Sequence, residues 1–400
     1  MIQLFIKHPI TTMNIGFEAK RAFTNGTGLG HYSRTLISSL AEYFPANNYF
    51  LFTPKQTAMF NTAHHANVQV VTPSTFPSTL FTAAWRSSWV KSDLKRLKID
   101  LYHGLSHEIP MGINKTNIKS VVTIHDLIFE RNPEQYNPID VKIYRKKFSY
   151  ACEHADRIIA ISQQTKNDII QFYKIPESKI DICYQSCHPS FGVQVSDAQK
   201  QAIKKQYNLP NNFFLYVGSI IERKNLLTIC KALKQLYTSS ILGSSDGAIP
   251  LVVIGNGSAY KQEVKAYIHK NNMDNKVIFL SEKYHNESFT SAKDFPAIYQ
   301  LATAMIYPSF FEGFGIPVLE ALWSKLPVIT SNVSCMPETG GKDALYVDPN
   351  SADEMAHAMM QVATDAHLRQ GMIAKSWLHA QHFTQQKCAA NVMKVYENLV

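Results

Sequence analysis

The chain has 400 residues, which is enough for two or three domains with substantial hydrophobic cores. Its apolar content of 45% and charged content of 18% are ordinary for a globular protein, and no apolar run approaches the roughly 20 residues of a membrane-spanning helix. The opening apolar run is too short for a signal peptide. Because Met13 begins a strand-like segment, residues 1–12 are interpreted as an extension or as the result of a misplaced start codon. The six cysteines form no CxxC pair, which predicts reduced thiols, a cytoplasmic location and no metal site.

The formal net charge of +9 is unevenly distributed. Residues 1–200 hold 22 basic and 15 acidic side chains, whereas residues 201–400 hold 18 and 16. A basic first half favours an anionic partner, and a lipid phosphate, a membrane surface or a nucleic acid would each fit.

Strand-like and helix-like segments alternate along the chain, which is typical of parallel sheets with crossover helices. Strand-like segments of the first half lie at Asn14–Glu18, Tyr49–Thr53, Val68–Thr72, Asp100–His103, Ser120–Ile124, Arg157–Ile161 and Lys179–Tyr184. Helix-like segments lie at Tyr32–Tyr43, Thr82–Leu97 and Ser162–Tyr173. The polar, proline-containing stretch 185–212 is interpreted as a linker with one short helical piece.

A second alternating set follows the linker. Its strand-like segments lie at Phe213–Val217, Leu251–Ile254, Lys276–Leu280, Ala304–Tyr307, Val328–Thr330 and Ala344–Val347. The Ser/Gly-rich segment from Tyr237 to Pro250 is predicted to be a long loop. The sequence therefore predicts an α/β protein of two Rossmann-like domains, 1–195 and 209–384, facing a central cleft. Ligands of such sheets bind at the carboxyl ends of the strands.

The first motif with chemical content is a glycine-rich turn, NGTGLG, ahead of a helix-like segment. Backbone N–H groups near Gly26, Gly28 and Gly30 can approach a phosphate, and the alternative is a tight turn that needs positive φ. The motif is not G-x-G-x-x-G, and the second strand lacks the terminal acid that binds a nicotinamide ribose. A dehydrogenase is therefore disfavoured.

Polar residues also follow two strands in the middle of the first half. His125 and Asp126 close the strand VVTI, and His103 ends the preceding strand. Carboxyl ends of buried strands are where sites form in α/β proteins, which makes these residues candidates for lining the cleft. The alternatives are structural histidines and an aspartate that caps the next segment.

The string FFLYVGSIIERKNL repeats the strand–glycine–helix pattern in the second half. Arg223 and Lys224 are predicted at the start of a helix beyond Gly218, where two cations oppose the helix dipole unless an anion lies between them. A diphosphate would supply that anion, and an exposed basic turn is the alternative. The loop Leu280–Lys283 is a candidate for contacts to a nucleotide base.

The most informative stretch is YPSFFEGFGIPVLEAL, residues 307–322. Phe314 and Gly315 precede a helix that is predicted to open at Pro317, so that free N–H groups near Ile316 favour an anion. Glu312 in the loop and Glu320 in the first helical turn can accept hydrogen bonds from hydroxyl groups. An anion site flanked by such carboxylates suits a nucleotide sugar, and the alternative is a strand–turn–helix connection with solvated acids.

The segment FTAAWRSSWVKSDLKRLK combines Trp85 and Trp89 with five cations. It fits an amphipathic helix on an anionic membrane, but the favoured interpretation is an ordinary crossover helix whose tryptophans pack on the sheet. The cationic run Tyr144–Lys147 allows the same two interpretations.

The sequence around Glu312 and Glu320 resembles the E-x7-E motif of the retaining family 4 glycosyltransferases, which have the GT-B fold. The glycine loop, His125-Asp126 and Arg223-Lys224 match that family in the same order, with Ser219 where some members have a further arginine. The resemblance implies a retaining hexosyltransferase that needs no metal and no cofactor beyond a nucleoside diphosphate sugar.

The resemblance also implies residue roles. Arg223 and Lys224 would stabilise the leaving diphosphate together with the helix start before Ile316, and Glu312 would bind the sugar hydroxyls. Glu320 would bind the donor ribose, and His125 would contact the transferred sugar. Gly28, Gly30, Asp126, Gly218, Phe314 and Gly315 would line the binding sites. The last helix, 385–400, would cross back to the first domain.

Strings similar to these motifs occur in mannosyl- and rhamnosyltransferases of polysaccharide assembly, which makes GDP-mannose the first candidate donor. The expected acceptor is a glycan or lipid-linked glycan hydroxyl, with peripheral contact to the inner membrane face. Rival functions are a same-fold epimerase or phosphorylase and a basic nucleic-acid-binding protein, and the sequence shows no nucleic-acid-binding motif. Donor base, sugar, acceptor, linkage and oligomeric state stay open.

Overall fold

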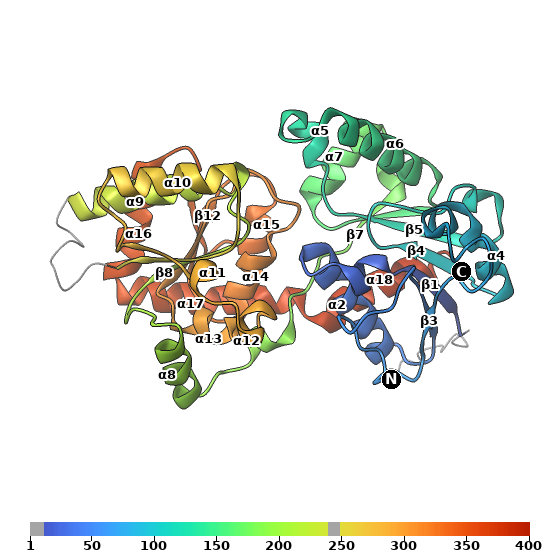
Figure 1. Ribbon diagram of the computed structural model, residues 1–400, viewed down its shortest axis with the longest axis horizontal. Helices are drawn as coiled ribbons and strands as arrows, with labels where there is room; N and C mark the ends of the chain where they lie inside the picture. The colour runs from blue at the N-terminus through green and yellow to red at the C-terminus, as the bar shows by residue number, and fades with distance from the viewer. Residues whose placement is uncertain (1–11, 239–248) are drawn as a thin grey trace, which may run out of the picture. The chain divides into compact units, whose positions relative to one another are not determined.

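The computed structural model describes residues 12–238 and 249–400. The expected extension at residues 1–12 lies outside this range except for Thr12, as does most of the expected Ser/Gly-rich loop. Contacts divide the chain into unit 1, Met1–Ser186 with Thr384–Val400, and unit 2, Cys187–Phe383 (Figure 1).

Unit 1 contains a parallel seven-stranded sheet in the order β3-β2-β1-β4-β5-β6-β7. The strands are β1 (Asn14–Glu18), β2 (Asn48–Phe52), β3 (Val68–Val71), β4 (Leu101–Gly104), β5 (Lys119–Ile124), β6 (Arg157–Ala160) and β7 (Ile180–Ile182). Chain order runs outward from β1 on one side and from β4 on the other, so the topological switch point lies between β1 and β4.

The helices of unit 1 provide the crossovers. They are α1 (Lys20–Thr24), α2 (Gly28–Tyr43), α3 (Thr82–Ala84), α4 (Val90–Arg96), α5 (Ile128–Arg131), α6 (Pro138–His154), α7 (Gln163–Tyr173) and the C-terminal α18 (Gln385–Glu397). Helix α18 packs against α2, as the helix predicted to return to the first domain should.

Unit 2 contains a parallel six-stranded sheet in the order β10-β9-β8-β11-β12-β13. The strands are β8 (Phe214–Val217), β9 (Leu251–Ile254), β10 (Val277–Phe279), β11 (Ala304–Tyr307), β12 (Val328–Ser331) and β13 (Leu345–Val347). Four of them are buried at every residue, because helices cover both faces of a parallel sheet. The switch point here lies between β8 and β11.

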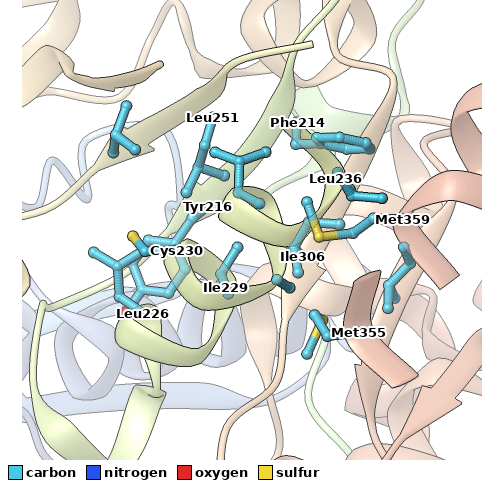
Figure 2. Packing of buried hydrophobic residues seen from close by; sticks show 14 of the residues in the cluster. Phe214, Tyr216, Leu226, Ile229, Cys230, Leu236, Leu251, Ile306, Met355 and Met359 are labelled. Atoms are coloured by element: carbon cyan, nitrogen blue, oxygen red, sulfur yellow. The ribbon is translucent and has the colours of Figure 1, made fainter. Parts of the chain in front are cut away.

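The helices of unit 2 are α8 (Asp197–Gln206), α9 (Leu226–Thr238), α10 (Ala259–Lys270), α11 (Leu280–Lys283), α12 (Glu287–Thr290), α13 (Phe295–Leu301), α14 (Ile316–Trp323), α15 (Met336–Gly340), α16 (Ala352–Thr364) and α17 (Ala366–Ala380). Figure 2 shows the apolar side of α9, with Ile229 and Leu236, packed among Ile306 of β11 and Met355 and Met359 of α16. This core holds the loops at the carboxyl ends of β8 and β11 in place.

The structure confirms the α/β class and the two parallel sheets, and it corrects two predicted elements. The stretch expected as a linker does contain the expected short helix, α8, but this helix packs against α13 and is part of unit 2. The helix expected at Thr82–Leu97 is interrupted by a π-helical turn at Trp85–Trp89. There the Ser87 carbonyl accepts a hydrogen bond from the Met111 N–H (2.7 Å), which competes with regular helical bonding.

Candidate active site

The predicted donor-site residues of unit 2 gather at its topological switch point. Gly218, Arg223 and Lys224 follow β8, and Glu312 follows β11, its neighbour in the sheet. Ligands of doubly wound sheets bind outside the carboxyl ends of the strands at this point. The sheet topology and the sequence motifs therefore indicate the same location for the donor site.

Two glycines let the loops after β8 and β9 approach closely. Gly218 and Gly255 have φ of +153° and +152°, a region that other residues rarely adopt. A Cβ at Gly255 would lie 1.8 Å from the Gly218 carbonyl oxygen, and one at Gly218 would lie 3.1 Å from Lys224 Nζ. A side chain at Gly218 would therefore press on the lysine amine.

Arg223 and Lys224 lie on a 3₁₀ turn, Glu222–Lys224, rather than at the start of α9 as predicted. Asn225 ends the turn in the left-handed region, with φ of +60°. Its buried amide donates to the carbonyls of Pro308 (3.2 Å) and Pro349 (2.6 Å), which ties the turn to two other loops. Sequence reasoning gave Asn225 no role, although asparagine tolerates this conformation better than most residues.

The two cations face Glu312. Arg223 Nη1 lies 2.9 Å and Lys224 Nζ lies 3.6 Å from Glu312 Oε1. Lys224 also donates to the Tyr307 hydroxyl (2.6 Å), which in turn donates to Glu312 (3.0 Å). The three charged side chains keep 12–14% of their surface exposed, so the group is enclosed but reachable.

Glu312 is therefore not a solvated acid. Burial alone raises the pKa of its carboxyl, but Lys224, Arg223 and hydrogen bonds from Ser309 and Tyr307 outweigh this effect and lower the pKa below its ordinary value. The Phe310 N–H donates to the Arg223 carbonyl (2.8 Å), which fixes the basic turn against the Glu312 loop. Sequence reasoning assigned no role to Tyr307 or Ser309, because neither carries a charge.

Helix α14 begins at Ile316, one residue before the predicted start, and Gly315 precedes it with φ of +90°. Pro317 is accordingly the second helical residue, and Glu320 lies in the second turn rather than the first. The Ile316 N–H has no intrahelical partner by helix geometry. The Phe314 side chain, by contrast, is buried against Phe383.

Glu320 occupies an environment opposite to that of Glu312. Its Oε2 accepts a hydrogen bond from the buried Tyr299 hydroxyl (2.8 Å) of α13. Burial raises the pKa of Glu320 to about 7, and the effects of Tyr299 and Lys224 only partly oppose it. Two carboxylates eight positions apart thus differ in their readiness to ionise, which sequence spacing did not reveal.

A Glu320→Gln variant should gain stability relative to the wild type as pH rises from 5 to 8. The folded-state pKa lies above the unfolded value, so ionisation of Glu320 removes stability from the wild type as pH rises toward 7. The neutral amide avoids this loss, which is about 1–3 kcal/mol. Denaturant unfolding at the two pH values measures it, with the exposed Glu287→Gln as a control that should show no such trend. Parallel pH curves for wild type and Glu320→Gln would contradict the assignment.

In unit 1, His125 follows β5 and is buried. Its Nε2 lies 2.9 Å from the Leu105 carbonyl, so Nε2 carries the proton and Nδ1 is the acceptor. Burial lowers the pKa of His125 to about 4, which keeps the ring neutral near pH 7. Tyr32 and His107 pack edge-on against the ring. Asp126 accepts from the N–H of Ile128, the first residue of α5 (3.2 Å), although the N-cap position of that helix is Leu127.

The other strand-end histidine, His103, does not line a cleft. It is fully buried, with its ring nitrogens 2.5 Å from the Tyr396 hydroxyl of α18 and 2.8 Å from the Thr123 hydroxyl. Burial lowers the pKa of His103 to about 3. Its role is to join α18 to the sheet.

The glycine-rich turn also differs from expectation, since Gly28 and Gly30 lie inside the first turn of α2 rather than ahead of it. A Cβ at Gly30 would lie 1.8 Å from the Asn25 carbonyl oxygen, whereas one at Gly28 would meet no atom within 4 Å. Gly30 is therefore explained by close packing. The structure gives no steric reason for Gly28, which sits at the exposed start of the helix.

The loop proposed for base contacts forms α11. Leu280 is buried, Ser281 accepts from the Gly255 N–H (2.9 Å), and Glu282 is paired with Lys261 (2.8 Å). Over the described ranges, no group of three or more His, Cys, Asp or Glu side chains is arranged to hold a metal ion. None of the helices in these ranges combines the length and the hydropathy that crossing a lipid bilayer requires.

Comparison with known protein families gives two matches, which together cover most of the chain. The model described as "Glycosyl transferases group 1" matches residues 197–376, and "Glycosyltransferase Family 4" matches residues 28–189. The two matches fall on the two units and contain the motifs described above. The chain therefore consists largely of two glycosyltransferase domains, one of each described family, and is a glycosyltransferase.

Its relatives include two O-antigen enzymes. O-antigen chain mannosyltransferase B of Escherichia coli is 26% identical over 316 residues, 78% of this chain and 77% of that protein. O-antigen chain mannosyltransferase RfbU of Salmonella typhimurium is 25% identical over 349 residues, 84% and 88% of the two chains. The match to serotype-specific mannosyltransferase WbdA of Escherichia coli spans only 34% of that longer protein.

Solved structures agree on the fold. A glycosyltransferase from Rickettsia africae gives a TM-score of 0.73 at 17% identity and covers 97% of this chain and 99% of its own. Anabaena Alr3699/HepE in complex with UDP gives 0.71 at 15% identity, with 97% and 100% covered. At such identities the likeness shows the GT-B fold alone.

Proposed function

We propose that the protein is a retaining hexosyltransferase of polysaccharide assembly. It transfers a sugar, with mannose as the first candidate, from a nucleoside diphosphate donor to a hydroxyl of a glycan or lipid-linked glycan. The O-antigen mannosyltransferases among its relatives support the sugar and the pathway class. The family 4 match supports retention of the anomeric configuration.

The observation that carries this proposal is the Arg223–Lys224–Glu312 group at the switch point of unit 2. Two largely enclosed cations lie on a turn that Asn225 fixes, so their backbone positions are set before an anion arrives. The Ile316 N–H at the start of α14 adds a further donor. As the bond between sugar and diphosphate breaks, negative charge grows on the leaving phosphate, and these fixed donors stabilise it.

The two carboxylates then take different parts of the donor. Glu320, with one oxygen held by Tyr299, accepts hydrogen bonds from the ribose hydroxyls through the other. Glu312 exchanges part of its contact with the cations for hydroxyls of the transferred sugar. In unit 1, the neutral His125 offers Nδ1 as an acceptor to a sugar hydroxyl. The reaction needs no metal and no further cofactor in this scheme.

The test is a thermal-shift and hydrolysis screen over GDP-mannose and a panel of UDP-, GDP-, ADP- and dTDP-sugars. Stabilisation by one base, with slow release of a sugar that keeps its anomeric configuration, is expected. Heparin and a DNA duplex should not stabilise the protein selectively. Conversion of one nucleotide sugar into another would instead indicate an epimerase, and no response to any nucleotide would refute the proposal.

We also propose that the protein binds at the inner membrane face, but through other aromatic residues than the sequence suggested. Trp85 is fully buried and bonded to Asp93 (2.8 Å), so it cannot face a membrane. Phe81 and Trp89 are 53% and 40% exposed and pack against each other, close in sequence to the exposed Lys95 and Lys98. Exposed aromatics and cations within one short segment suit an anionic interface.

A variant with Lys95 and Lys98 changed to glutamine should therefore float less with anionic vesicles than the wild type. Each cation contributes about 1 kcal/mol near such a surface, and the attraction should fade as salt rises. Glutamine at the exposed Lys205 and Lys231 of unit 2 is the matched control. If wild type fails to float even at low salt, the membrane part of the proposal is wrong.

A further inference from the structure

Unit 1 has its own polar cluster at its own topological switch point. Glu18 is the last residue of β1, and Glu108 lies four residues beyond the end of β4, the strand beside it. Arg86 joins the two carboxylates, with Nε 3.0 Å from Glu18 and Nη2 3.0 Å from Glu108. Lys147 pairs with the second oxygen of Glu108 at 3.0 Å.

Glu18 carries more acceptor capacity than its partners use. The residue is only 5% exposed, and its Oε1 accepts from Arg86 and from the Lys20 N–H (3.4 Å). Its Oε2 has no hydrogen-bond partner among the described residues. Ser106, Trp323 and Ser376 have completely buried polar atoms without a partner, but Glu18 Oε2 is not completely buried. A nearly buried carboxylate thus keeps one oxygen that has no protein partner and is not completely enclosed. Burial raises its pKa, a cost that an incoming donor would offset.

The cluster continues along the sheet edge to His125. The neighbour of Glu108, His107, packs its ring against the His125 ring with centroids 5.1 Å apart. Strands β1, β4 and β5 are adjacent in the sheet, so Glu18, the loop after β4 and His125 follow one another across its carboxyl edge. This edge is where the fold accommodates ligands.

We propose that Glu18, Arg86 and Glu108 form a subsite for a neutral sugar residue of the acceptor. The inference rests on the proposed function. A sugar hydroxyl both donates and accepts, and the subsite matches it with the open Glu18 oxygen as acceptor and the unused Arg86 N–H groups as donors. Lys20 also lies near Glu18, Arg86 and Glu108, so the charges of the group do not by themselves select a ligand. The open Glu18 oxygen favours a neutral pyranoside over a phosphate, because a sugar hydroxyl can donate to a carboxylate and an ionised phosphate cannot.

The competing explanation is that the ion pairs only attach the loops carrying Arg86 and Glu108 to the sheet. Two variants separate the explanations. Glu18→Gln keeps the shape and one acceptor oxygen for Arg86 but weakens acceptance from a ligand. Asp168→Asn is the matched control, since Asp168 of α7 is fully buried and paired with Arg131 of α5, and neither is an ion-pair partner of Glu18, Arg86 or Glu108.

The experiment titrates methyl α-glycosides of mannose, glucose, galactose and N-acetylglucosamine, observed by saturation-transfer NMR. The wild type should bind at least one of them, and Glu18→Gln should weaken that binding by about tenfold, as expected for a lost hydrogen bond to a charged group. Asp168→Asn should bind it normally even if its melting temperature falls as much. Nucleoside diphosphate affinity should be unchanged in both variants.

Unchanged glycoside binding in Glu18→Gln would overturn the subsite. Equal losses in both variants would assign the effect to stability and would also overturn it, as would a wild type that binds no neutral glycoside. Failure of the proposed function is distinct from these outcomes. It would show as absent nucleotide binding by wild type, whereas glycoside binding is measured without nucleotide.

Discussion

Replacing Lys224 with alanine should lower turnover by about 100-fold or more, the loss seen when one donor to a developing anion is removed. Lys224 Nζ is held by the Tyr307 hydroxyl at 2.6 Å and sits beside Glu312, so its position is fixed before a donor arrives. Alanine removes the ammonium group and leaves Arg223 as the only cation of the turn. The effect should fall on turnover more than on affinity, because charge on the leaving phosphate grows during bond breaking.

Steady-state kinetics with the donor identified by the nucleotide screen would measure this loss. The matched control is Lys231→Ala, an exposed lysine on α9 that follows the same turn, and it should retain wild-type turnover. Circular dichroism should show the same fold for both variants. A Lys224→Ala protein with near-normal turnover would remove the lysine from the mechanism.

Replacing Glu312 with glutamine should separate binding from transfer. The carboxylate now neutralises Arg223 and Lys224, and its pKa lies below the ordinary value, so the wild type carries a full negative charge beside the anion site. Removing that charge should leave nucleoside diphosphate affinity intact or raise it. Transfer should nevertheless fall by about 10- to 100-fold, because a charge-assisted hydrogen bond to the sugar, about 1.5–3 kcal/mol, is lost.

Glu320→Ala is the contrasting variant. It should weaken nucleoside diphosphate binding by about 1–3 kcal/mol through the loss of a hydrogen bond to the ribose. With a nucleotide that lacks the ribose hydroxyls, Glu320→Ala and wild type should bind almost equally. Calorimetry on the two glutamate variants therefore has opposite expected outcomes. An equal loss of nucleotide affinity in both would contradict the division of roles.

Several features of this protein followed from the sequence alone. The strands were predictable because parallel strands covered on both faces need continuous apolar runs, such as LVVI of β9 and AMIY of β11. The order of strands and helices then implied two α/β sheets, which the structure confirms. Arg223, Lys224 and Glu312 were recognisable because their motifs resemble those of a glycosyltransferase family, whereas the residues alone also allowed a basic turn and solvated acids.

Tertiary structure decided which of these groups are partners. Arg223 and Glu312 are 89 positions apart, and Glu18 and Arg86 are 68 apart, so no local periodicity could pair them. The raised pKa of Glu320 and the neutral ring of His125 likewise depend on burial by segments distant in the chain. Sequence motifs determined which chemical groups are available. Their charge states and contacts depend on how the folded chain brings the loops together at the sheet edges. The physical reason is that electrostatic interactions depend on distance and burial in space.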